Sequence, residues 1–243
     1  MRLSRKGRMK RFAGVLLGAL VATAATAGRF SEFETELRGV YATYRAALFT
    51  TNQNKPDEAA AAVAALSQGW TVLSQKWARA APPQYADDPQ FAPTLTMAAG
   101  EIADASRQIA AGDLGAAHVT LEKIRDQLGA LRTRNHVAVF SDRMDEFHKE
   151  MEKTLGRLQA DLTPAALADL RGEAAVLAYL ADRIAAAPPP EAKSSADFGP
   201  LVEGVAKAVR AVRQAAASGD AEATKRALHG LKKPYSILFL KFG

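Results

Sequence analysis

Apolar residues recur every three to four positions along most of the chain, which is the spacing that places them on one face of an α-helix. The first stripe follows the capping-box sequence Ser31–Glu34 and predicts a helix that ends near Thr50. Caps, prolines, Gly-Asp pairs and the apolar period indicate further helix boundaries near Pro56, Pro82, Thr94, Gly112, Val137, Pro164, Pro188, Asp197 and Gly219. The pattern predicts an all-α protein with about eight amphipathic helices.

The same stripes identify the side chains that we expect in the core. In the first half these are Phe33, Leu37, Tyr41, Tyr44, Leu48, Leu66, Trp70, Leu73, Trp77, Leu114, Ala117, Leu121, Ile124 and Leu128. In the second half they are Phe140, Met144, His148, Met151, Leu155, Leu158, Leu228, Leu231, Leu238 and Phe239. Large apolar side chains at helical spacing are typical of helices that bury one face against each other.

The helix-ending signals occur twice, at a nearly constant separation. Phe33 and Phe140 are 107 positions apart, Pro56 and Pro164 are 108 apart, Pro82 and Pro188 are 106 apart, and Gly112 and Gly219 are 107 apart. We interpret this as an internal duplication, in which residues 28–135 and residues 136–243 form two tandem antiparallel four-helix bundles, each with its own core. The junction at Arg132–His136 is short, so we expect the two bundles to be rigidly connected.

Residues 1–27 have the three parts of a cleavable secretion signal. Basic residues precede an apolar run from Phe12 to Ala25, and Ala25-Thr26-Ala27 has the small side chains of a cleavage site. The alternative, a membrane anchor, requires about 20 apolar residues, and this run is shorter. The sequence therefore predicts export, cleavage after Ala27, and a soluble protein that is periplasmic or secreted.

Removal of this signal peptide changes the charge of the protein. The whole chain has 32 Lys and Arg against 26 Asp and Glu, an excess that would favour nucleic acid or an anionic membrane surface. The signal holds six basic residues and no acidic one, so the remainder is balanced at 26 against 26. We therefore expect no nucleic-acid partner. Since no second segment is long and apolar enough to span a bilayer, we also expect no stable membrane insertion after cleavage.

The order and punctuation of the helices resemble the soluble four-helix-bundle cytochromes, both the b type and the c-prime type. The similarity is clearest from Ala110–Asp113 to Asn135 and from Ala217–Asp220 to Phe242. The resemblance implies a four-helix-bundle scaffold. It extends over both halves and consists of the order and ends of the helices, not of one diagnostic motif.

The haem-binding residues of that family are not carried over. Where the c-prime type has Cys-x-x-Cys-His, this chain reads Leu231–Tyr235, and the absence of cysteine excludes covalent c-type haem, disulfides and thiolate metal sites. The final-helix histidine of the b type would fall near Arg132 and near Phe239, neither of which ligates haem iron as imidazole does.

One helical stripe carries candidate metal or haem ligands. Met144, His148 and Met151 lie at positions i, i+4 and i+7, so two thioethers and one imidazole share a face. Thioethers with imidazole suit Cu(I), and a His–Met pair suits haem iron. The same positions match core residues of the first half at the repeat offset. A buried histidine between gap-filling methionines is therefore the alternative.

Two sets of charged residues are further candidates. His118, Arg125 and Arg132 recur every seven residues, with Glu122 one turn after His118, and such a row holds either an anion or the carboxylates of a neighbouring helix. The acidic residues Asp142, Asp145, Glu146, Glu150 and Glu152 could attract cations, but they spread around their helix, which favours a solvated surface.

The sequence has no phosphate-binding glycine loop, no nucleophile elbow and no zinc-protease histidine pair, so we expect a binding protein and not an enzyme. Two hypotheses follow. The first is a periplasmic carrier of copper, iron or haem, with Met144, His148 and Met151 as ligands. The second is a cofactor-free structural module that binds a periplasmic protein partner.

Overall fold

The computed structural model of the protein describes the backbone of residues 13–243 and the side chains from residue 28 onward. Residues 1–12, which include the whole basic start of the expected signal peptide, lie outside the described residues. Within the described part of the chain every regular element is helical and there is no strand, which confirms the all-α prediction.

The α-helices have the following bounds: α1 Ala13–Asn52, α2 Pro56–Trp77, α3 Phe91–Ala110, α4 Leu114–Arg134, α5 Phe140–Leu155, α6 Pro164–Ala186, α7 Phe198–Ser218, α8 Ala221–His229 and α9 Lys232–Phe242. Three short 3-10 turns, Pro83–Tyr85, Gly156–Gln159 and Pro190–Ser194, lie in the connections. None of the helices in residues 13–243 is both long enough and apolar enough to cross a membrane.

The start expected for the first helix is wrong. α1 is continuous from Ala13, so Ser31 lies inside the helix, where its carbonyl accepts a hydrogen bond of 2.7 Å from the Thr35 hydroxyl. The alanine-rich segment before Ser31 has high helix propensity and extends the helix toward the N-terminus. A capping-box sequence starts a helix only where the preceding residues do not continue it.

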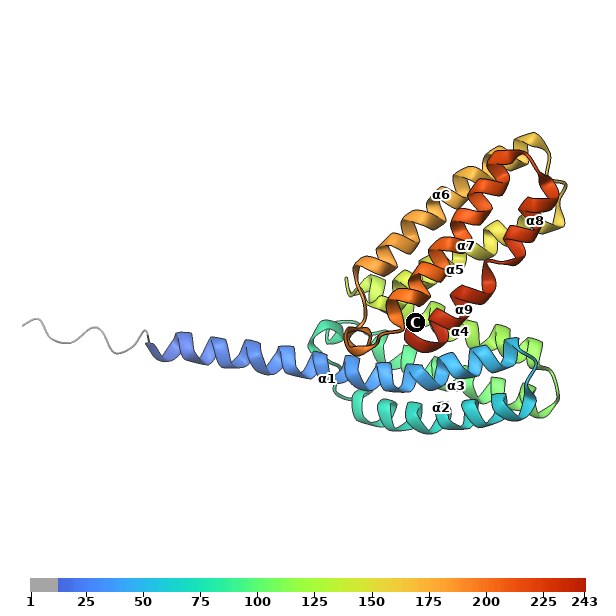
Figure 1. Cartoon of the computed structure of the whole chain (residues 1–243). Helices are drawn as coiled ribbons and strands as arrows, with labels where there is room; N and C mark the ends of the chain where they lie inside the picture. The colour runs from blue at the N-terminus through green and yellow to red at the C-terminus, as the bar shows by residue number, and fades with distance from the viewer. Residues whose placement is uncertain (1–12) are drawn as a thin grey trace, which may run out of the picture.

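The helices pack in two groups (Figure 1). In the first group α1 lies beside α2 and α4, and α3 packs against α2 and α4. In the second group α6 packs against α5 and α7, and α7 also contacts α8 and α9. Contacts between α1 and α9 join the two groups.

The Gly-Asp signals begin helices as expected. Gly112 and Gly219 have φ values of 82° and 77°, the left-handed conformation that glycine adopts without steric cost. The carboxylate of Asp113 then accepts from the Ala116 amide, at 2.8 Å, to begin α4. In the same way the carboxylate of Asp220 caps α8. These local signals fix the helix starts at matching places in the two halves.

The final helix of the second half differs from its counterpart. A single helix was expected after Gly219, but the chain turns at Gly230 and Leu231, and the segment divides into α8 and α9. The junction between the halves also turns, because α4 ends at Arg134 and α5 begins only at Phe140.

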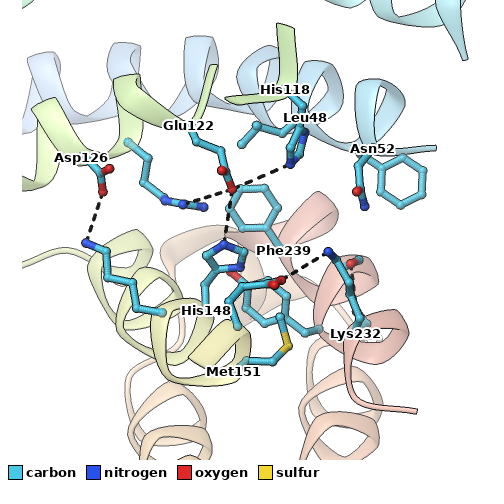
Figure 2. A pocket seen from close by; sticks show the side chains of 15 residues that line it. Leu48, Asn52, His118, Glu122, Asp126, His148, Met151, Lys232 and Phe239 are labelled. Atoms are coloured by element: carbon cyan, nitrogen blue, oxygen red, sulfur yellow. Dashed lines mark hydrogen bonds and ion pairs between the residues drawn. The ribbon is translucent and has the colours of Figure 1, made fainter. Parts of the chain in front are cut away.

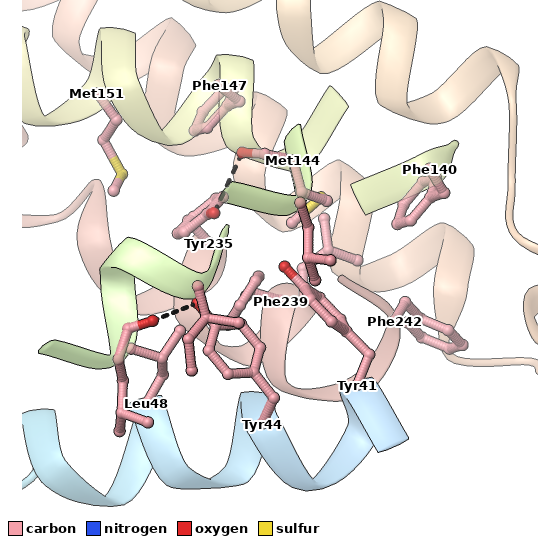
Figure 3. Packing of buried hydrophobic residues seen from close by; sticks show 14 of the residues in the cluster. Tyr41, Tyr44, Leu48, Phe140, Met144, Phe147, Met151, Tyr235, Phe239 and Phe242 are labelled. Carbon is pink, nitrogen blue, oxygen red and sulfur yellow. Dashed lines mark hydrogen bonds between the residues drawn. The ribbon is translucent and has the colours of Figure 1, made fainter. Parts of the chain in front are cut away.

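The buried side chains form one cluster that extends through both halves, whereas two separate cores were expected. Figure 3 shows Tyr41 and Tyr44 of α1 on one side of this region and Met144 of α5 and Phe239 of α9 on the other. The Tyr235 hydroxyl of α9 donates to the Met144 carbonyl at 3.1 Å. Independent folding of residues 28–135 and 136–243 stays a prediction.

Candidate functional site

A cavity of about 520 Å³ lies where the two groups of helices meet (Figure 2). Four helices line it. They contribute Leu48, Phe49 and Asn52 from α1, His118, Glu122, Arg125 and Asp126 from α4, His148, Lys149, Met151 and Glu152 from α5, and Lys232, Tyr235, Ser236 and Phe239 from α9. Because α1 and α4 belong to the first half and α5 and α9 to the second, neither half forms this cavity alone.

Glu122 lies at the centre of the polar side. Its Oε1 atom is 3.4 Å from His148 Nε2, 3.7 Å from His118 Nε2 and 3.4 Å from Arg125 Nη2. The hydrogen bond from His148, helped by the charge of Arg125, lowers the pKa of Glu122 to about 2 against the opposing effect of burial. Glu122 is therefore ionised at neutral pH.

His118 is held in one orientation by α1. Its Nδ1 atom lies 3.0 Å from the hydroxyl oxygen of Thr51. That hydroxyl directs its single hydrogen to the carbonyls of Ala47 and Leu48, so it accepts from Nδ1–H. Burial lowers the pKa of His118 and favours the neutral ring, whose Nε2 lone pair then points to the Glu122 side of the cavity.

Ion pairs connect α4 to α5 beside the cavity. Arg132 Nη2 lies 2.6 Å from Asp142 Oδ1, and Arg125 Nε lies 2.7 Å from Asp145 Oδ1. Lys149 Nζ is 2.7 Å from Asp145 Oδ2. The expectation that the seven-residue row of basic side chains on α4 pairs with a neighbouring helix is confirmed for these two arginines.

The expectation of a solvated acidic surface on α5 holds only in part. Asp142 and Asp145 face α4, where they neutralise the two arginines. Glu146 pairs with Arg183, and Glu150 pairs with Lys153 one turn away. The sequence pattern showed that the five carboxylates spread around α5, but it could not show that a basic helix covers one side.

An apolar wall faces the polar side chains. Met151 and Tyr235 are buried, and the Tyr235 ring stacks on Phe147 at 5.5 Å and on Phe239 at 6.0 Å between ring centroids. Leu48 and Phe49 extend this wall from α1. The cavity therefore presents a charged side and an aromatic side to whatever enters it.

The structure brings two of the three candidate metal ligands to the cavity. His148 and Met151 line it, whereas Met144 lies in the core outside the lining. Among the residues that the structure describes, no group of three or more His, Asp or Glu side chains is arranged to hold a metal ion. A thioether–imidazole site would therefore have to form from His148 and Met151.

The side chains at the positions that correspond to the haem ligand of b-type bundle cytochromes, Arg132 and Phe239, do not suit haem iron. Arg132 is buried and bound to Asp142 through its Nε and Nη2 atoms. Phe239 is part of the aromatic wall. Comparison of the chain with family models, with curated proteins and with solved structures found no match.

Reasoning from the sequence identified His118, Glu122 and His148 but placed them in two unrelated sets. It missed Thr51 as the partner of His118, and it treated Tyr235 only as part of a region without cysteine. The spacing of His118 and Glu122 by four residues was the available signal, because it places both side chains on one face of α4.

Proposed function

We propose that this protein is a non-catalytic binding protein that takes a small amphipathic molecule into the cavity between its two halves. The observation that carries the proposal is the pairing of an ionised carboxylate with an aromatic wall in a cavity of about 520 Å³. Binding sites for small molecules are typically concave and largely apolar, with a few polar groups that fix the orientation of the ligand.

Binding, rather than catalysis, is supported by how the polar groups are used. The Tyr235 hydroxyl donates to a backbone carbonyl, and the Ser236 hydroxyl donates to the Lys232 carbonyl. Arg125 and Lys149 are held by Asp145. These groups hold the walls in place. Of the described residues that line the cavity, Tyr235 and Ser236 carry hydroxyls, and each hydroxyl bonds to a backbone carbonyl rather than to a base that would activate it as a nucleophile.

The proposal places this binding protein in the periplasm, on a scaffold like that of the bundle cytochromes. Its support is the signal-like sequence of residues 1–27 and the punctuation of the helices. A carrier of this kind would bind its ligand outside the cytoplasm and release it unchanged.

Filling the cavity tests the proposal. We choose Ser236→Trp, because Ser236 lines the cavity and a tryptophan there occupies the space between α9 and α4. The probe is the neutral dye N-phenyl-1-naphthylamine, whose fluorescence rises in apolar surroundings. The wild-type protein is expected to raise this fluorescence saturably at one equivalent, and Ser236→Trp is expected to lose most of the effect.

Ser67→Trp is the matched control, because Ser67 is exposed on α2, and no residue of α2 lines the cavity. It should bind the dye like the wild type. Equal dye binding by all three proteins, or none by the wild type, contradicts the proposed function.

A further inference from the structure

The two oxygen atoms of Glu122 have different surroundings. Oε1 faces the donors His148 and Arg125, and it lies 3.7 Å from His118 Nε2. Oε2 receives no hydrogen bond from any residue that the structure describes, and it is not among the buried polar atoms without partners. Because Glu122 lines the cavity, Oε2 is an anionic acceptor that a ligand in the cavity can reach.

The basic side chains of the cavity, in contrast, already have carboxylate partners. Arg125 Nε is 2.7 Å from Asp145, and Lys149 is 2.7 Å from Asp145 and 3.2 Å from Asp126. Lys232 Nζ lies 3.3 Å from Glu152 Oε1. An anionic ligand would have to displace these carboxylates, whereas a cation meets an acceptor that is open.

A second acceptor lies close to the first. The neutral His118 ring donates through Nδ1 to Thr51, so its Nε2 lone pair is available on the Glu122 side. An ammonium group has several N–H donors and can serve both acceptors at once. Tyr235 and Phe239 line the same cavity, so the apolar body of such a ligand meets an aromatic wall.

We infer that the ligand of this cavity is an organic cation, an ammonium group on an aromatic or alkyl body, with Glu122 Oε2 and His118 Nε2 accepting from the ammonium and the body packed on Tyr235 and Phe239. The inference rests on the proposed function and names the chemical class of its ligand. A bare metal ion fits less well, because the described residues hold no ready group of three His, Asp or Glu donors.

The test compares ligands of similar size and different charge by isothermal titration calorimetry at pH 7 with the full chain. The probes are 2-phenylethylammonium, hexylammonium, the neutral 2-phenylethanol and the anionic phenylacetate. Both ammonium compounds are expected to bind at least tenfold more tightly than the alcohol and the carboxylate. They should also displace N-phenyl-1-naphthylamine.

Glu122→Gln keeps the shape of the side chain and removes its charge, so it should weaken ammonium binding at least tenfold and leave the binding of 2-phenylethanol unchanged. Glu203→Gln is the matched control, because Glu203 is exposed on α7, outside the cavity lining, and pairs with the surface residue Arg210. If Glu122→Gln does not fold, the calorimetric comparison of the four ligands with the wild-type protein is sufficient to test the inference.

The two proposals fail in different ways. If the dye binds in the cavity but the ammonium compounds bind no better than the alcohol, the proposed function stands and the cation inference is wrong. Tighter binding of phenylacetate, or one equivalent of Zn²⁺ or Cu²⁺ that is lost in Glu122→Gln, also overturns the inference. If the dye does not bind, the proposed function itself fails.

Discussion

Glu122 Oε1 lies within 3.7 Å of nitrogen atoms from His118, Arg125 and His148. Two of these side chains come from α4 itself and the third from the second half of the protein. A carboxylate in such surroundings stays ionised although it is half-buried. Its charge therefore contributes to stability as well as to the cavity, and the contribution depends on pH.

We predict the sign of that dependence. Folding lowers the pKa of Glu122 from 4.5 to about 2, so its stabilising effect is complete above about pH 4.5 and disappears as the pH falls toward 2. Glu122→Gln should lower the free energy of unfolding by about 1–2 kcal/mol at pH 7. Urea unfolding of both proteins at pH 7, 5, 4 and 3 measures the difference. A difference that stays constant down to pH 3 would contradict this assignment.

For single residues, the sequence predicts which side chains share a helix face, but not which side chains of other helices they contact. His118 and Glu122 were placed together because both are on α4. The approach of His148 depends on how α5 folds back on α4, which periodicity does not specify. The hydroxyl of Thr51 is unremarkable in the sequence and acquires its role only from the contact between α1 and α4.

At the scale of elements, the connection between α4 and α5 depends on buried charge. Arg132 is 4% exposed, and Asp142 is its partner. Asp142 has a second role, because its Oδ2 accepts from the Val139 amide at 2.9 Å and so caps the start of α5. One side chain therefore both begins a helix and attaches it to the preceding one.

Asp142→Asn separates these roles, since an asparagine oxygen still accepts from the Val139 amide but the buried Arg132 loses the carboxylate with which it forms its ion pair. We expect a loss of about 3 kcal/mol in the free energy of unfolding, measured by urea unfolding followed by circular dichroism. Asp104→Asn, in an exposed pair with Arg107, should cost at most about 1 kcal/mol. Equal costs for the two variants would show that Arg132 does not need its partner.

Helix ends that depend on local chemistry could be predicted, and ends that depend on tertiary contacts could not. The glycine and aspartate signals before α4 and α8 were confirmed because the turn and the cap use neighbouring residues. The break at Gly230 was missed because the stripe of apolar residues continues across it, from Leu228 to Leu238.

At the scale of the whole molecule, the merged core predicts that the two halves unfold together. Side chains of α1 and α4 pack against α5 and α9, and Arg45 of α1 donates through Nε to the Leu240 carbonyl of α9 at 3.2 Å. Separation of the halves would expose Tyr41 and Phe239, both of which are buried.

The tryptophans make this measurable, because Trp70 and Trp77 are the only two in the chain and both lie on α2 in the first half. Phe147→Ala empties a fully buried site in the second half and should cost about 3–5 kcal/mol. We expect tryptophan fluorescence and circular dichroism to report the same shift in the urea midpoint. Tyr179→Ala, at an exposed position of α6, should shift neither signal. A fluorescence midpoint that does not move in Phe147→Ala would indicate that the halves unfold separately.

The turn at Gly230 and Leu231 has an evolutionary consequence. In the first half the corresponding stretch is one uninterrupted helix, α4, whereas in the second half the turn directs α9 toward α1, where Tyr235 and Phe239 close the cavity. The predicted duplication would then make the cavity a property of the pair of copies, because a single copy lacks half of its walls. It would also make the cavity depend on the one turn by which the second copy differs from the first.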